Sequence, residues 1–202
     1  MVLTQIGEIG ISFEGREYKL RPSLYAMTQI GEPVEIVRVY ASVMSEEPHA
    51  EQFDDALAVI YACSEDDLAE LYGGHEATEG GLKYAPGSAP VEHVLPLARC
   101  LMKHGITGAL PELPRKAGQD PEFVKEFDAR AHVSLAIAHL GMSSAEAWQM
   151  TMTELVGALR AKFPQIESNT PGARAPTADE HNATMEWYER VEQARKRKQG
   201  TR

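Results

Sequence analysis

Alternation of apolar and polar residues near the start of the chain predicts a β-hairpin over residues 8–20. The apolar positions of this alternation are Ile9, Ile11, Phe13, Tyr18 and Leu20. Between the two arms stands Glu14-Gly15, and the glycine supplies the positive φ that a tight hairpin turn requires. An isolated two-stranded hairpin is only marginally stable in water, so we expect the rest of the protein to cover one face of it.

After Arg21-Pro22-Ser23 the apolar period lengthens from two residues to about 3.6, which is typical of amphipathic helices. Pro22 cannot donate to a strand ladder, and the hydroxyl of Ser23 can cap the helix that follows. The predicted helices cover residues 24–30, 34–44, 50–62, 68–72, 91–104 and 121–140, a short stretch after Ser143, residues 153–163, and a last segment from Thr177.

The strongest helix prediction covers residues 121–140. This helix opens at Asp120-Pro121, where a first-turn proline is tolerated, and Gly141 follows its end. Its apolar residues recur about every four positions, at Phe123, Phe127, Ala131, Leu135 and Ala138. This spacing predicts that the stripe faces the core.

Pairs of a hydroxyl residue and an acidic residue three positions later mark helix starts, because each side chain can bond the other's backbone N–H. Two capping boxes lie close together, Ser143 with Glu146 and Thr151 with Glu154, and a similar pair is Ser64 with Asp67. Thr177 with Glu180 has the same spacing and starts the last predicted helix. The two boxes predict a short helix, a break near Met150-Thr151, and a longer helix that Pro164 closes.

Stretches rich in glycine and proline separate the predicted helices. We expect residues 73–90 and 105–120 to be connectors, the first of them a mobile loop. A similar stretch at residues 165–176 is predicted to be a linker. The fold prediction is therefore mainly α: a helical domain at 1–164 that includes the hairpin, this linker, and a mobile C-terminal helix with a basic tail at 177–202.

The chain is acidic, with 30 Asp and Glu against 20 Lys and Arg in 202 residues and a formal net charge of −10. This balance argues against a nucleic-acid binder, which needs a basic face, and against binding to an anionic membrane. No apolar run approaches the ~18 residues that span a bilayer, and no signal-peptide pattern follows Met1. We expect Cys63 and Cys100 to be buried, reduced thiols, with a disulfide as the alternative, so a reducing cytosol fits best.

Residues that could carry chemistry are scattered along the chain. His132 and His139 share a helix face, but no Cys, Asp or Glu accompanies them at metal-site spacing. Asp54-Asp55 and the acidic run 65–67 are explained better by a solvated helix face and a helix N-terminus than by acid–base catalysis. The glycine pairs lack the Lys-Ser/Thr of a phosphate loop. We therefore predict no catalytic, metal or cofactor-binding residues, and a non-enzymatic role.

Two features have two interpretations each. The run 195–198, Arg-Lys-Arg-Lys, is either a disordered charge run that keeps a helix end soluble, which we favour, or an anchor for an acidic partner. Trp148 is either a core residue, which we favour, or part of an adaptable apolar surface for helical partners. In the second case Trp148, Met150, Met152 and Leu155 form the candidate partner-binding site.

Two blocks of the sequence follow a recognisable pattern. The first block, residues 9–31, is the hairpin, then Arg-Pro-Ser-Leu, then a helix that ends at Ile30-Gly31. The second block, residues 141–155, reads Gly-Met-Ser-Ser-x-Glu-x-Trp-x-Met-Thr-x-x-Glu-Leu. Both blocks resemble tail assembly chaperones of long-tailed bacteriophages. The middle of the chain has no such likeness.

The resemblance implies a non-enzymatic role in the host cytoplasm. Such chaperones bind the long, helical tape measure protein before the tail forms, keep it soluble, and help to recruit tail tube subunits. The implied partners are therefore the tape measure and tail tube proteins, with no cofactor, and self-association into a homo-oligomer is left open. An acidic exterior with apolar grooves suits this role. An aggregation-prone helix needs a partner whose grooves cover its apolar face and whose charged exterior keeps the complex in solution.

The alternative function is a structural protein of the virion, such as a head–tail connector or a minor tail component. Such a protein is incorporated stably into particles, whereas a chaperone leaves them.

Overall fold

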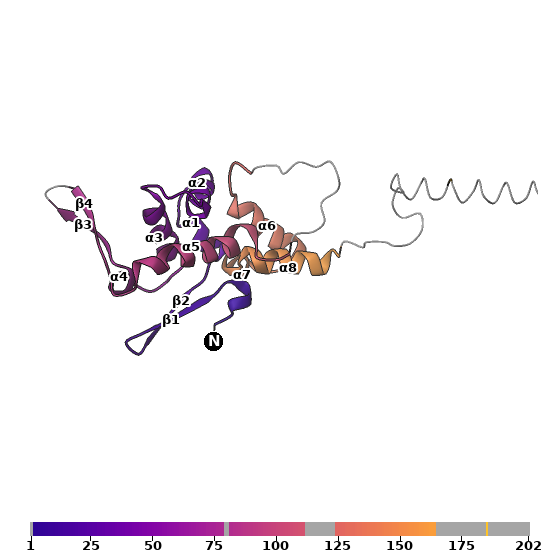
Figure 1. The fold of residues 1–202 in the computed structure, drawn as a ribbon. Coiled ribbons are helices and arrows are strands. Elements are labelled where there is room, and N and C mark those ends of the chain that lie inside the picture. Colours follow the sequence, from indigo (N-terminus) through magenta and orange to yellow (C-terminus); the bar gives the residue numbers. More distant parts are fainter. Residues whose placement is uncertain (1, 79–80, 112–123, 165–184, 186–202) are drawn as a thin grey trace, which may run out of the picture. The chain divides into compact units, whose positions relative to one another are not determined.

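The computed structural model describes residues 2–78, 81–111, 124–164 and 185 (Figure 1). The chain divides into two compact units, Met1–Phe163 and Pro164–Arg202. The linker predicted at 165–176 lies outside the described residues, and so do the last helix and the basic tail, apart from Met185, which is helical.

The first unit is mainly α with an N-terminal β-hairpin, which confirms the predicted fold class. Its α-helices are α1 (Leu24–Thr28), α2 (Pro33–Met44), α3 (Gln52–Ala62), α4 (Ala69–Tyr72), α5 (Val94–Met102), α6 (Ala129–Leu140), α7 (Ser144–Gln149) and α8 (Met152–Lys162). Three short turns of other helical types accompany them: η1 (Thr4–Ile6), η2 (Val91–His93) and the π turn η3 (Lys103–Thr107). Among the described residues, none of these helices combines the length and the apolar character that crossing a membrane requires.

The predicted N-terminal hairpin is present as β1 (Ile9–Phe13) and β2 (Arg16–Leu20), which pair antiparallel. Its turn residues Glu14 and Gly15 have φ angles of 47° and 79°. Positive φ at both central positions matches the twist of paired strands, as in a type I′ turn. Leu20 is fully buried, so the second strand anchors the hairpin to the helices.

A second hairpin lies inside residues 73–90, so the prediction that this segment is a loop is wrong. It consists of β3 (Gly74–Thr78) and β4 (Gly81–Ala85). Most residues of both strands are exposed, so no alternation of apolar residues reveals them in the sequence. The glycines here also allow close packing, because a Cβ on Gly87 would lie 2.3 Å from the carbonyl oxygen of Leu71.

Helix α6 begins at Ala129 and not at residue 121 as predicted. The carboxylate of Asp128 accepts hydrogen bonds from the amides of Arg130 and Ala131, at 2.9 and 3.2 Å. This N-cap fixes the start of the helix, and the described residues before it, 124–128, are not helical.

The predicted core stripe of this helix also lies on the wrong face of the helix. The buried residues are Ala129, Val133 and Ala136, whereas Leu135 is 39% exposed. The predicted stripe was counted from two phenylalanines that stand before Ala129 in the sequence, and Ala129 is where the helix begins. One of them, Phe127, is buried in the segment before the helix, and the other, Phe123, lies outside the described residues.

The capping predictions have mixed outcomes. Ser143 and Thr151 form the two predicted capping boxes, and the chain breaks between α7 and α8 as expected. The third pair forms no box, because the Ser64 hydroxyl bonds within its own turn. Asp67 accepts a hydrogen bond from the amide of Ala69 at 2.9 Å, and Ser64 takes no part in this contact. Ser23 caps α1 as predicted.

The helix predicted over residues 91–104 is present as the succession η2, α5 and η3. Pro96 lies in the first turn of α5, where its missing N–H breaks no helical hydrogen bond. The π turn occupies the start of the predicted connector at 105–120, of which residues 112–120 lie outside the described part. Gly105 allows α1 to pack closely, because a Cβ there would lie 2.6 Å from the sulfur of Met27.

The core is built around the contact between α3 and α5, with α2 packed against both. Side chains from several elements are fully buried in it, including Leu20 of β2, Met27 of α1 and Leu101 of α5. The short helix α1 contacts α2 and α3 as well as α6, α7 and η3. It is therefore the element through which the central helices meet the C-terminal helices of this unit.

Candidate functional site

The two sequence blocks, residues 9–31 and 141–155, lie against each other in the fold. Ser23 and Thr151 pair in an isolated antiparallel bridge. The amide of Leu24 donates a hydrogen bond to the carbonyl of Met150 at 2.8 Å. The start of α1 is thus joined to the start of α8 through backbone contacts.

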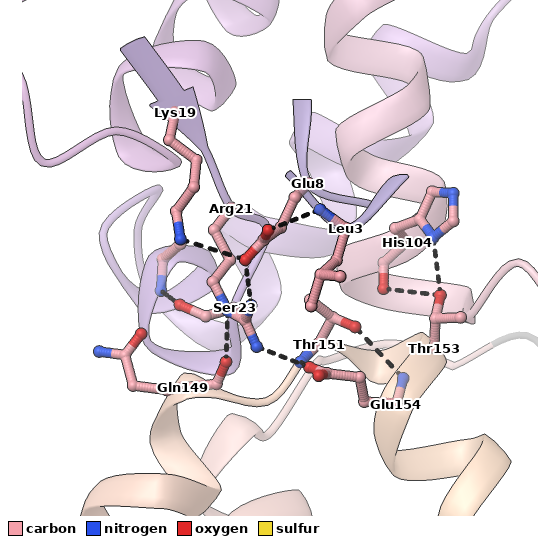
Figure 2. A network of polar contacts seen from close by, with 11 residues as sticks. Leu3, Glu8, Lys19, Arg21, Ser23, His104, Gln149, Thr151, Thr153 and Glu154 are labelled. Atoms are coloured by element: carbon pink, nitrogen blue, oxygen red, sulfur yellow. Dashed lines mark hydrogen bonds and ion pairs between the residues drawn. The ribbon is translucent and has the colours of Figure 1, made fainter. Parts of the chain in front are cut away.

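Arg21 is the centre of a polar network at this junction (Figure 2). Its Nε donates to the carbonyl of Gln149 at 2.9 Å, and its Nη2 lies 2.9 Å from the carboxylate of Glu154. Its Nη1 pairs with the carboxylate of Glu8, which also accepts a bond from Lys19 at 3.2 Å. One guanidinium therefore holds together the N-terminal segment, the end of β2 and the start of α8.

Glu8 is the buried acid of this network, with 2% of its surface exposed. Burial by itself raises the pKa of a carboxyl, but the hydrogen bonds from the Leu3 amide, Arg21 and Lys19 outweigh this effect. The pKa of Glu8 consequently lies below its ordinary value, and the group is charged at neutral pH.

A second polar cluster fixes the other side of the start of α8 (Figure 2). The Thr153 hydroxyl lies 2.9 Å from Nδ1 of His104 and accepts a hydrogen bond from the amide of Ala109 at 3.0 Å. Burial, with a smaller contribution from Lys103, lowers the pKa of His104. A neutral His104 therefore contributes a hydrogen bond, not a charge, to the packing of η3 on α8.

Next to this junction the surface has a hollow of about 520 Å³ beside Trp148. It is lined by Tyr25, Thr28, Arg130, Ala145, Trp148 and Gln149. Tyr25 is 52% exposed, and Trp148 is half-buried against the core. Two aromatic side chains from α1 and α7 thus offer apolar area to solvent.

A neighbouring hollow of about 620 Å³ shares Tyr25 and Gln149 with the first. It runs along the other side of α1, past the end of α3, to the exposed Glu65 and Asp66. We call the two adjoining hollows the α1 groove. Arg21 lines this groove as well, so the polar network adjoins it.

The four predicted partner-binding residues lie in two different environments. Trp148 lines the α1 groove. Met150, Met152 and Leu155 are only 8%, 7% and 1% exposed and belong to the core. These three side chains offer almost no surface to a partner, so Trp148 is the member of the set that the fold leaves accessible. It also packs on the core, so its two interpretations are compatible.

The cysteines and histidines do not form a reactive cluster in the described part of the chain. Cys63 is buried as expected, and burial raises the pKa of its thiol, which keeps it protonated. Cys100 is exposed, contrary to the expectation, and both thiols are free. His132 stacks on Phe127, and no group of three or more His, Cys, Asp or Glu residues there is placed to hold a metal ion.

Several residues of this site were not identified from the sequence. Glu8, Arg21, Tyr25 and Arg130 are ordinary charged or aromatic residues in their local context, and only the tertiary contacts bring them together. The one available signal was Tyr25, an aromatic residue off the apolar face of the predicted helix formed by Leu24, Met27 and Ile30.

Residues 48–183, about two thirds of the 202-residue chain, match the model of a protein family of unknown function, DUF6246. The match includes the second block and not the first. No curated protein and no solved structure matches the chain.

Proposed function

We propose that this chain, which belongs to the DUF6246 family, is a non-enzymatic chaperone of bacteriophage tail assembly that binds the tape measure protein. The family description assigns no activity, so the proposal rests on the two sequence blocks and on the surface that they build together. Its partners are the tape measure protein and then the tail tube subunits, and it acts in the host cytoplasm.

The observation that carries the proposal is the joining of the two blocks around the α1 groove. The first block contributes Tyr25 and the second contributes Trp148, and both line one hollow. Tryptophan and tyrosine are enriched at the energetic centres of protein interfaces, because they bury a large area at low cost in side-chain entropy. The blocks that resemble tail assembly chaperones therefore also form a surface suited to binding a protein.

The charge of the chain supports the same role. A net charge of −10 repels other copies and keeps a complex with an apolar helix in solution. Binding of a helix in a groove with aromatic anchors is a common form of protein recognition.

Co-expression with the product of the neighbouring tape measure gene tests the proposal. We expect the tape measure protein to become soluble and to co-purify with this chain. Trp148→Ala should abolish the complex while the chain stays folded. Leu82→Ala is the matched control, because Leu82 is 75% exposed on β4, does not line the groove, and should leave binding unchanged. An insoluble tape measure protein in the presence of the wild-type chain would reject the proposal.

Mass spectrometry of purified particles distinguishes the chaperone from the alternative, a structural component of the virion. A chaperone should be absent or far below stoichiometric amounts. Stable incorporation at the copy number of a connector or tail subunit would favour the alternative.

A further inference from the structure

The α1 groove has charges of opposite sign at its two ends. Glu65 and Asp66 are exposed at the end near α3, and Arg130 is exposed at the end near α6. Among the described residues, none of these three side chains has an ion-pair partner within the groove or outside it.

The basic residues at the acidic end do not cancel this difference. Lys19 and Arg21 line that hollow, but both pair with Glu8, and Arg21 also pairs with Glu154. Their charges are therefore compensated within the protein. The charge left for a ligand at this end is that of the two free acids.

Two acids, Glu32 and Asp128, line a separate hollow that adjoins Arg130, but neither lines the hollow that contains Trp148. Asp128 directs its carboxylate to the amides of Arg130 and Ala131 at the N-terminus of α6. In the hollow that contains Trp148, Arg130 is the only charged lining residue. The charge that this hollow offers to a ligand is therefore positive, and Tyr25, which lines both hollows, stands where the two ends adjoin.

We infer that the groove binds an α-helix of a protein partner in one direction, with its N-terminal end at Glu65–Asp66 and its C-terminal end at Arg130. A helix carries partial positive charge at its N-terminus and partial negative charge at its C-terminus, so this direction matches both ends of the groove. The inference deepens the proposed function and rests on it for the choice of a helical protein as the occupant.

The same charges define the side chains of the preferred helix. Its middle presents an apolar face to Tyr25 and Trp148. Its first turn carries Lys or Arg against the two acids, and its last turn carries Asp or Glu against Arg130. A free helix is stabilised by the reverse order, with acidic residues in its first turn and basic residues in its last. The groove therefore selects against helices that have this common arrangement of charges.

Two synthetic helices of identical composition test the direction of binding. Both have about 14 residues with a Leu/Ala face, an acetylated N-terminus and an amidated C-terminus, which remove the terminal charges. One has Lys in the first turn and Glu in the last, and the other has the two sets exchanged. The protein is the full chain with Trp187→Phe, so that Trp148 is its single tryptophan and its fluorescence reports binding.

We expect the peptide that begins with Lys to bind roughly tenfold more tightly, as the sum of a few exposed ion pairs. The triple variant Glu65→Lys, Asp66→Lys, Arg130→Glu should reverse this preference. Circular dichroism should show an unchanged fold, because all three side chains are exposed. If the same two peptides exchange their order of affinity between the two proteins, a difference in peptide helicity cannot explain the preference.

Three results would overturn the inference: equal affinity of both peptides for both proteins, no binding of either peptide, or a groove occupied by a second copy. The last would appear as a dimer in sedimentation that the triple variant disrupts. The co-expression experiment does not depend on any of these, so a failed orientation can be told apart from a failed chaperone function.

Discussion

Glu8 is an almost fully buried carboxylate that accepts hydrogen bonds from the Leu3 amide, Arg21 and Lys19. Because these contacts hold its pKa below the ordinary value, its charge stabilises the folded state at neutral pH. This stability is fully present above the pKa of Glu8 in the unfolded chain, near 4.5. It is lost as the pH falls through the lower pKa that Glu8 has in the folded state.

We predict that Glu8→Gln lowers the free energy of unfolding at pH 7 by about 1–3 kcal/mol, because it leaves part of the Arg21 and Lys19 charge without its partner. Urea denaturation of both proteins from pH 7 to pH 3 measures this. The difference between them should shrink as the pH falls, because the wild-type carboxyl becomes neutral. A constant difference over this range would mean that the Glu8 charge has no such role.

At the scale of single elements, the caps of α7 and α8 have the same chemistry in different surroundings. Thr151 is fully buried, whereas the capping contacts of Ser143 are exposed. We predict that Thr151→Ala costs about 2 kcal/mol of stability and Ser143→Ala about 0.5–1 kcal/mol. Thr151→Ser keeps the capping hydroxyl and should recover most of the loss. Chemical denaturation followed by circular dichroism gives the three values, and equal costs for the two alanine variants would contradict the argument.

The second hairpin depends on one close backbone crossing at its base. A Cβ on Gly87 would lie 2.3 Å from the Leu71 carbonyl oxygen and 2.6 Å from the Gly73 nitrogen, and neither backbone atom can move freely. We predict that Gly87→Ala lowers the thermal midpoint by several degrees, at a cost of about 1–3 kcal/mol. Gly74→Ala is the control, because a Cβ there meets nothing within 4 Å and should change stability by less than about 0.5 kcal/mol. Equal midpoints for the two variants would refute the crossing as a constraint.

At the scale of the whole molecule, the predictions that succeeded depend on local rules. The Glu14-Gly15 turn and the capping boxes at Ser143 and Thr151 each involve residues within a few positions of one another, so the sequence displays them directly. The predictions that failed depend on neighbours distant in sequence or on exposure. The exposed strands of the second hairpin carry no apolar period. The cap at Asp128 sets the start of α6, although a regular apolar spacing in the sequence begins before it.

The site was predictable only in part, for the same reason. Trp148 is identifiable from the sequence because it stands between two capping boxes and is followed by Met150, Met152 and Leu155. The residues that make it a site, Tyr25 and Arg130, lie on other elements, and no spacing rule relates them. The burial of Met152 and Leu155 follows from the way in which α8 docks on η3 and α6, which is a tertiary property.

The division of the chain into two units leads to a last prediction. Every buried hydrophobic side chain among the described residues lies between Tyr18 and Leu155, within the first unit. We predict that a chain ending at Pro164 unfolds cooperatively with a free energy within about 0.5 kcal/mol of the full chain carrying Trp187→Phe. Trp148 fluorescence during urea denaturation reports on both proteins.

A chain ending at Met150 is the control, because it removes α8 and the fully packed Leu155 with it. It should lose cooperative unfolding altogether, since deleting the helix opens the core and also removes Glu154 from Arg21. If the chain ending at Pro164 is instead less stable by more than about 1 kcal/mol, then residues 165–202 contribute to the folding of the first unit. Binding to the tape measure protein should then be measured on the full chain only.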